Sequence, residues 1–246
     1  MQFNKSVQSF ILTFLSASLL CNAVAQPSFA NSRANNTRQG LPGRRISGGV
    51  RKGNCFADFN QSLVAIMPRN NLGRTMLARP ALWFSVPEII GEKTAEFQLF
   101  NASDEQIYSA PVDISGDEGI SKLQLPPSAP ELAVDETYRW TFSIGCTDSS
   151  QFVVQGWIHR VAPPSVLLQE VEDASIEERI TLYSSANLWH EQVTALVNLR
   201  QSNTTLTTFQ IEWAEMLAAA GLTSYVSNTI SEPMEVEDVS SSLIAY

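Results

Sequence analysis

The hydrophobic period of this chain changes at Ala162-Pro163-Pro164, and this change constrains the fold more than any other feature of the sequence. Before it, apolar residues recur at every second position, as in strands with one buried face. After it, they recur at the spacing of an amphipathic helix. Because proline cannot continue a strand ladder, the two prolines predict a boundary between a β-rich segment and a helical one.

The clearest predicted strand spans residues 137–145, where Tyr138, Trp140, Phe142 and Ile144 alternate with polar residues. Shorter alternations precede it, and residues 152–161 predict a further strand, with Gly-, Asn-, Asp- and Pro-rich turns between them. We expect six to eight short strands, arranged as an antiparallel, immunoglobulin-like β-sandwich over residues 54–162.

Tyr138 follows a turn and starts a strong strand. Immunoglobulin-like sandwiches place a corner-closing Tyr at such a position, and its hydroxyl bonds back to the backbone a few residues upstream. Cys146 comes eight residues later rather than two, so the sequence does not imply an antibody-type disulfide.

Residues 163–230 predict a small helical domain. A short helix covers about 165–172, Ser175 and Glu178 form a capping box that opens a second helix, and Asn187 is expected to cap a third. A fourth helix ends at Gly221. The helices resemble a tetratricopeptide-like hairpin array, too short to stand alone, so we expect them to pack on the sandwich.

The N-terminus predicts a secretory signal peptide over residues 1–25. Lys5 is the only charged residue of the first thirty, an apolar run follows, and Ala23-Val24-Ala25 forms a small-x-small cleavage site. Cleavage after Ala30, lipid attachment at Cys21 and an uncleaved anchor helix are alternatives. Because the run is shorter than the about 20 apolar residues of a membrane span, we expect no transmembrane insertion.

A basic arm leads an acidic body. Residues 1–52 hold seven bases and no acid, so the rest of the chain carries nine bases against all 25 acids, a net charge of −16. Such a body repels phosphates, so we expect no nucleic acid as a partner. We expect disorder in the arm (26–53) and in the acidic, Ser-rich tail (231–246), because apolar residues are sparse there.

Only Cys55 and Cys146 remain after the predicted signal peptide. In an oxidising compartment, two thiols favour one disulfide. Two buried free thiols are the alternative.

Six blocks of sequence carry a resemblance to a known family: Arg44-Arg45-Ile46-Ser47-Gly48-Gly49-Val50-Arg51, Leu63-Val64-Ala65-Ile66-Met67-Pro68, Pro80-Ala81-Leu82-Trp83-Phe84-Ser85-Val86-Pro87, Trp140-Thr141-Phe142-Ser143-Ile144-Gly145-Cys146, Gly156-Trp157-Ile158-His159-Arg160-Val161 and Leu188-Trp189-His190-Glu191. In this order they resemble the cyanobacterial "domain of unknown function 928" family over about residues 40–225. The resemblance implies an exported cyanobacterial protein that retains both Cys55 and Cys146. It implies no activity.

No catalytic or cofactor motif stands out in the sequence. A Ser-His-Asp triad would need His159 or His190 beside an activated Ser, but no Gly-x-Ser-x-Gly elbow is present. His190-Glu191 lacks the second His of a zinc helix. The acidic pairs Asp104-Glu105 and Asp117-Glu118 lie in predicted turns, where they favour turn formation over glycoside hydrolysis. We predict no catalytic residue, no cofactor and no metal ligand.

Tryptophans are predicted on the outer faces of the sandwich. If Leu82 and Phe84 face the core, Trp83 faces away, and the same reasoning places Trp157 and Val153 outward. Outward tryptophans have three explanations: the helices cover them, they form a protein-binding patch, or they form a platform that stacks on sugar rings. Trp83, Trp157 and Val153 are therefore the predicted binding surface.

These features favour a non-catalytic interaction module of the periplasm or cell surface, with another envelope protein as its partner. The first alternative is a sandwich that binds carbohydrate or exopolysaccharide. An unrecognised hydrolase is the second alternative, and it would need an exposed His beside a Ser or a carboxylate.

Overall fold

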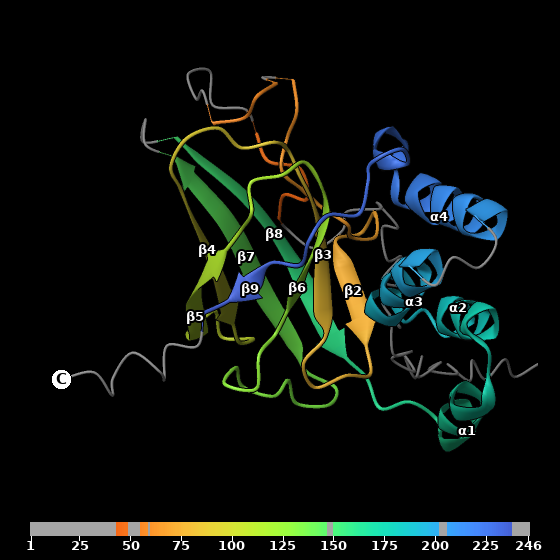
Figure 1. Ribbon diagram of the computed structural model, residues 1–246. Helices are drawn as coiled ribbons and strands as arrows, with labels where there is room; N and C mark the ends of the chain where they lie inside the picture. Colours follow the sequence, from red (N-terminus) through yellow and green to blue (C-terminus); the bar gives the residue numbers. More distant parts are fainter. Residues whose placement is uncertain (1–42, 49–54, 59, 147–149, 202–205, 238–246) are drawn as a thin grey trace, which may run out of the picture. The chain divides into compact units, whose positions relative to one another are not determined.

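The computed structural model describes residues 43–48, 55–58, 60–146, 150–201 and 206–237 (Figure 1). The predicted signal peptide lies outside these described residues, as do residues 26–42 and 49–53 of the predicted arm and residues 238–246 of the predicted tail. Over the described ranges the fold is mixed α+β, with two sheets of mostly antiparallel strands and four C-terminal α-helices.

The strands form two sheets. The smaller has the order β1-β3-β6 and the larger the order β2-β8-β7-β4-β5-β9. Neighbours are antiparallel except β2 and β8, which run parallel. The strands are β1 (Val64–Ala65), β2 (Leu72–Thr75), β3 (Ala81–Val86), β4 (Lys93–Phe100), β5 (Gln106–Asp113), β6 (Gly119–Gln124), β7 (Thr137–Cys146), β8 (Gln151–Arg160) and β9 (Glu235–Val236).

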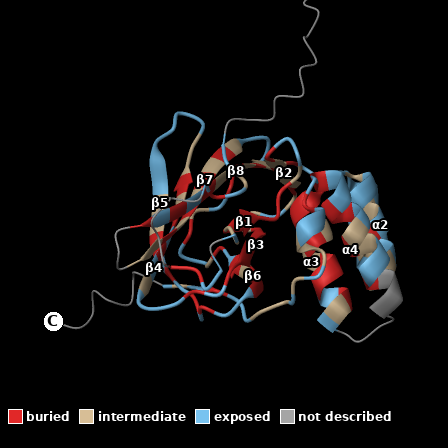
Figure 2. Ribbon diagram, turned by 90° about the horizontal axis from the view of Figure 1, so that it is seen from above, coloured by how far each residue is buried: buried red, intermediate tan, exposed pale blue. Residues whose placement is uncertain are grey.

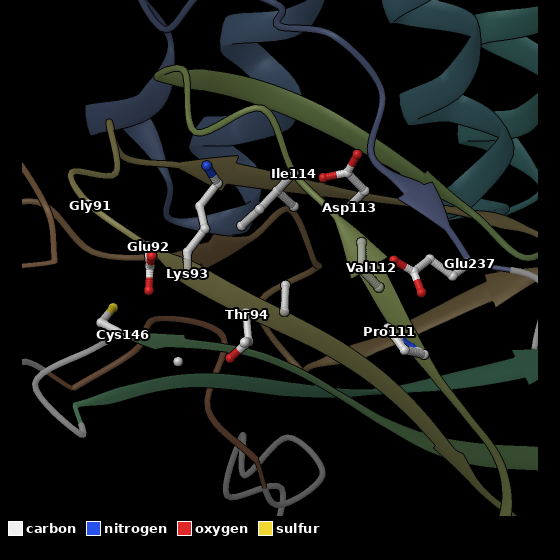
Figure 3. Close-up of a pocket in the computed structure, with 12 residues that line it drawn as sticks. Gly91, Glu92, Lys93, Thr94, Pro111, Val112, Asp113, Ile114, Cys146 and Glu237 are labelled. Atoms are coloured by element: carbon white, nitrogen blue, oxygen red, sulfur yellow. The ribbon is translucent and has the colours of Figure 1, made fainter.

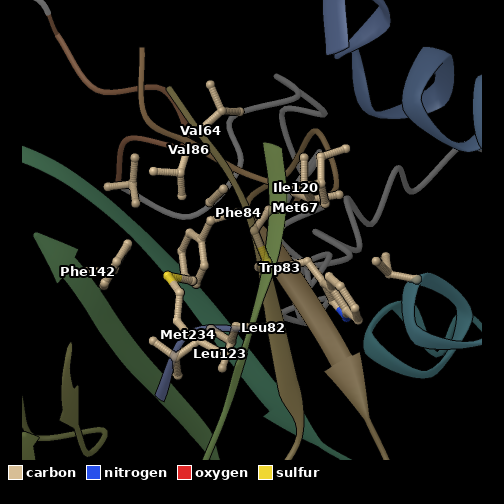
Figure 4. Close-up of a cluster of buried hydrophobic side chains, with 14 of the residues drawn as sticks. Val64, Met67, Leu82, Trp83, Phe84, Val86, Ile120, Leu123, Phe142 and Met234 are labelled. Atoms are coloured by element: carbon tan, nitrogen blue, oxygen red, sulfur yellow. The ribbon is translucent and has the colours of Figure 1, made fainter. Parts of the chain in front are cut away.

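The two sheets share one hydrophobic core. Phe84 of β3 meets Trp140 of β7 edge-on, with ring centroids 5.6 Å apart, and Phe142 at 4.6 Å. All three side chains are fully buried, and Figure 4 shows Phe84 directed toward Phe142. The alternation in residues 137–145 therefore reflects a strand with one face on this core.

Tyr138 makes the corner contact that its position predicts. The backbone N–H of Ala133 donates to the Tyr138 hydroxyl oxygen at 2.9 Å. This bond fixes the turn before β7, because it joins the start of the strand to a residue five positions upstream.

Strand β3 is covered on both sides, which explains why all six of its residues are buried. On the side away from the core, Trp83 points toward the helices (Figure 4). Its indole N–H donates to Thr194 Oγ1 of α3 at 3.1 Å. In Figure 2 the buried face of α3 is turned toward the strands, and α3 packs on β2 of the large sheet and β3 of the small sheet, so the helices form a third layer.

The four helices are α1 (Ser165–Asp173), α2 (Ile176–Ser185), α3 (Trp189–Gln201) and α4 (Leu206–Ala220). The predicted capping box is present: Ser175 Oγ accepts from the Glu178 N–H, and Glu178 accepts from the Ser175 N–H. Gly221, in the left-handed region at φ +72°, follows α4. Among the described residues, no helix has the length and apolar character of a membrane span.

Asn187 corrects one prediction, because it ends α2 instead of opening α3. Its φ is +56°, its N–H donates to the carbonyl of Ser184 at 3.0 Å, and the Leu188 N–H donates to that of Tyr183 at 2.8 Å. This pair of bonds is the Schellman arrangement at a helix C-terminus. Asparagine tolerates the left-handed conformation that the arrangement requires.

Residues at the end of the predicted arm and in the predicted tail form hydrogen bonds with the rest of the fold. At the end of the arm, Ser47 N–H donates to the Leu63 carbonyl and Ala65 N–H to the Arg45 carbonyl. In the tail, β9 pairs with β5 and Met234 is buried at 5% exposure. Partners distant in sequence supply the pairing and the apolar cover that the composition of these segments does not reveal.

A disulfide joins Cys55, in the segment before β1, to Cys146 at the end of β7. The two Cα atoms are 5.8 Å apart, within the usual range for a disulfide, and the residues are 91 positions apart in sequence. The bond is compatible with an exported protein.

Candidate functional site

His190 is buried between α3 and the sheets and is held by the backbone of β3. Its Nδ1 lies 3.0 Å from the carbonyl oxygen of Ala81, so a neutral ring with the proton on Nδ1 donates there. Its Nε2 is buried without a partner and lies against Gly73 of β2, where no side chain would fit. Burial lowers the pKa of His190 to about 4.

Glu191 anchors the same helix to β2. Its Oε1 accepts from the Thr75 hydroxyl at 2.6 Å and from the Met76 N–H at 2.8 Å, while Oε2 is buried without a partner. Burial raises the pKa of Glu191 above its ordinary value, although these hydrogen bonds act in the opposite direction. With exposures of 3% and 5%, His190 and Glu191 are closed to a substrate, and they join α3 to the sheets.

His159 lies in β8, half-buried, with its Nδ1 3.0 Å from Thr137 Oγ1. Within the described ranges, no group of three His, Cys, Asp or Glu side chains has the geometry to hold a metal ion. The predicted turn acids are placed at the surface, and Asp104 forms an ion pair with Arg139.

The predicted tryptophan surface divides into a covered and an accessible part. Trp83 is only 6% exposed because α3 lies over it, so Trp83 is not available to a ligand. Trp157 is half-buried, and Val153 on the same face of β8 is 37% exposed. Cover by the helices is the alternative that fits Trp83.

A cleft opens within the large sheet, where the ladder between β4 and β5 ends (Figure 3). Its volume is about 600 Å³, and Lys93, Asp113 and Glu237 contribute charged groups. Lys93 Nζ donates to the Ser115 carbonyl at 3.2 Å, which bridges one end of the cleft. Cys146 on its wall is in the disulfide and offers no nucleophile.

Helix α1 presents the most unusual surface, because none of its nine residues is buried. Val166 is 61% exposed and Leu168 is 47% exposed. A short helix gains most of its stability by burying an apolar face. Exposed apolar side chains on such a helix make it a candidate docking surface.

A groove of about 550 Å³ runs between α1 and α2, and we call it the α1–α2 groove. Val166 precedes Glu170 by four residues and Asp173 by seven, so all three share one face of α1. The six lining residues are Glu170, Asp173, Ala174, Glu178, Thr181 and Leu182.

The α1–α2 groove is acidic. Residues 165–185 contain five acids and one base, Arg179. Arg179 donates to the carbonyls of Val171 at 2.9 Å and Glu172 at 3.3 Å, so its guanidinium caps the C-terminal end of α1. Hydrogen bonds from Ser175 lower the pKa of Glu178 and keep this carboxylate charged. The groove therefore offers an apolar contact at Leu182 with negative charge around it, and Val166 is exposed on the face of α1 that carries Glu170 and Asp173.

Sequence reasoning missed this groove. Its signal was the run Val166-Leu167-Leu168 beside Glu170, in a helix too short to bury so much apolar surface against one neighbour. Only the structure shows that α1 has no buried residue among the described parts of the chain, since periodicity identifies an apolar face but not what lies against it.

Comparison with known proteins places the chain in a family. No curated protein and no solved structure matches it significantly. The family described as Domain of Unknown Function (DUF928) matches residues 46–230. This range includes all four helices and every strand except β9. The chain therefore belongs to the DUF928 family.

Proposed function

We propose that the protein is a non-catalytic interaction module that binds a basic, amphipathic helical segment of a partner protein in the α1–α2 groove. The exposure of Val166 on a helix with no buried residue carries this proposal. A partner helix that places apolar side chains on Val166 and Leu182 would remove this surface from water. Basic side chains on its flanks would face Glu170, Asp173 and Glu178.

The surrounding fold supports a docking role. The Tyr138 hydroxyl bond is a feature of immunoglobulin-like sandwiches, which commonly serve as binding scaffolds. The successive packing of α2 on α3 and of α3 on α4 supports a tetratricopeptide-like arrangement. We propose that the sheets and α3 form a rigid base for this docking surface.

We also propose that the protein is exported to the periplasm or cell surface of a cyanobacterium. The predicted signal peptide supports export, and the disulfide is compatible with it. Mass spectrometry of the protein recovered from envelope fractions of the native cell tests this. Export predicts a chain that begins at Gln26, or at Asn31 if cleavage follows Ala30, and intact protein in the cytoplasmic fraction would contradict it.

Photo-crosslinking in the native cell tests the docking proposal. A photoreactive amino acid replaces Thr181, which lines the groove, and in a matched control it replaces Gln151, an exposed residue of β8. We expect one protein adduct from position 181 that position 151 does not give, with a basic amphipathic segment at the crosslinked peptide. Equal adducts from both positions, or none from position 181, would contradict the proposal.

A further inference from the structure

A second candidate site is a small polar cavity that shares no lining residue with the α1–α2 groove. It has a volume of about 210 Å³ and lies between the segment before β1, the end of β3 and the segment that follows α4. Its polar lining residues are Asn60, Gln61, Ser62, Ser85, Glu118, Ser224, Tyr225 and Asn228. These residues come from four separate parts of the chain, so the fold itself assembles the cavity.

Two side-chain amides in the cavity are fixed in orientation. Asn228 Nδ2 donates to Ser85 Oγ at 2.8 Å, and Gln61 Nε2 donates to Glu118 Oε1 at 3.0 Å. Each amide keeps its carbonyl oxygen as an acceptor, and Glu118 keeps its second carboxylate oxygen. The lining therefore presents prearranged acceptors, as well as the hydroxyls of Ser85 and Ser224, which can donate or accept.

Tyr225 adds an aromatic surface to these polar groups. It is half-buried, and burial raises the pKa of its phenol, which stays protonated and can donate. An aromatic ring beside amides and hydroxyls suits a ligand with both C–H faces and hydroxyl groups.

Charge and size narrow the ligand class. Among the described residues that line the cavity, Glu118 alone is charged, and a negative lining disfavours a phosphate or a carboxylate as the ligand. At about 30 Å³ for each water in the liquid, the cavity has room for about seven waters. This is the size of one sugar ring rather than of a nucleotide or a drug-sized molecule.

We propose that this cavity binds one neutral sugar unit, either as a free monosaccharide or as a residue of a glycan. Tyr225 stacks on the C–H face of the ring, and Gln61, Glu118 and Asn228 accept hydrogen bonds from its hydroxyls. The site is separate from the α1–α2 groove and does not depend on the proposed protein docking. It also uses none of the outward tryptophans of the sandwich.

Saturation-transfer-difference NMR on the purified protein tests the site. The probes are glucose, galactose, mannose, rhamnose and N-acetylglucosamine, each as the monosaccharide and as a short oligosaccharide of the same unit. We expect saturation transfer to at least one of these sugars. Tighter binding of the oligosaccharide would identify a glycan residue as the ligand, and equal binding would identify the free sugar.

Matched variants locate the binding. Tyr225→Ala should weaken binding by about tenfold or more, and Gln61→Ala by about fivefold. Tyr183→Ala is the control for Tyr225→Ala, because Tyr183 is also a half-buried tyrosine. Gln98→Ala is the control for the amide, because Gln98 donates to Glu96 at 3.1 Å as Gln61 donates to Glu118. Both controls should bind as the wild type does.

Three results would overturn the proposal. They are no saturation transfer to any of the sugars, equal binding by the wild type and Gln61→Ala, and equal losses in the variants and their controls. If Tyr225→Ala unfolds, as judged by its thermal melt, Gln61→Ala and Glu118→Gln carry the test, because both replace accessible side chains at the rim.

Discussion

The buried His190 gives a quantitative prediction about acid stability. Its imidazole is removed from water, and burial lowers its pKa from 6.5 to about 4, although the hydrogen bond to the Ala81 carbonyl acts in the opposite direction. The unfolded chain therefore binds a proton near pH 6.5 that the folded protein excludes until about pH 4. Stability linked to His190 is full above pH 6.5 and is lost as the pH falls toward 4.

The size of this effect follows from the difference between the two pKa values. One pH unit is worth about 1.4 kcal/mol, so the complete loss is about 3 kcal/mol. Between pH 7 and pH 4.5, most of it, about 2 kcal/mol, should appear in the free energy of unfolding. Glu191 acts in the opposite sense, because its raised pKa favours the folded state as the pH falls.

Urea denaturation at pH 7 and pH 4.5, followed by tryptophan fluorescence, measures the effect. The variant His190→Gln cannot titrate, so the wild type should lose about 2 kcal/mol more than this variant between the two pH values. Glu191→Gln should lose more than the wild type, because it lacks the opposing contribution. If the wild type and His190→Gln lose equal free energy, the argument from His190 burial is wrong.

Three further variants test the fold. The double variant Cys55→Ser/Cys146→Ser removes a crosslink between residues 91 positions apart in sequence. It should lower the free energy of unfolding by about 4 to 5 kcal/mol, measured in urea without reductant. A loss below about 1 kcal/mol would refute the loop-entropy argument. Ser175→Ala removes the cap of α2 and should cost about 1 kcal/mol, while the exposed Thr181→Ala should cost less in the same thermal melts. Met234→Ala should cost about 2 to 4 kcal/mol by urea denaturation, and no loss would mean that the tail does not pack on the sheet.

Local patterns predicted the elements whose signal lies within their own sequence. The alternation around Trp140 identifies a strand, and the Ser175/Glu178 pair identifies a helix start, because both depend on neighbours in sequence. Tyr138 belongs to the same class, since its partner Ala133 is five residues away.

Features that depend on distant partners could not be predicted in this way. Strand β2 begins at Leu72, directly after Asn70-Asn71, and its parallel partner β8 is more than eighty residues away. Strand β9 has only two residues, and its pairing with β5 gives no periodic signal. The exposure of Val166 beside the candidate groove depends on what the described elements leave uncovered, which periodicity does not report.

The affinity of the crosslinked partner for charge-reversed variants tests the central claim most directly. Glu170→Lys/Asp173→Lys reverses two groove charges on α1, and Glu88→Lys, exposed in the turn after β3, is the control. If the α1–α2 groove binds a basic helical segment, the double variant should lose about tenfold or more in affinity at low salt, with a smaller loss at high salt, while Glu88→Lys binds as the wild type does. Equal affinity for the wild type and the double variant would contradict the docking function.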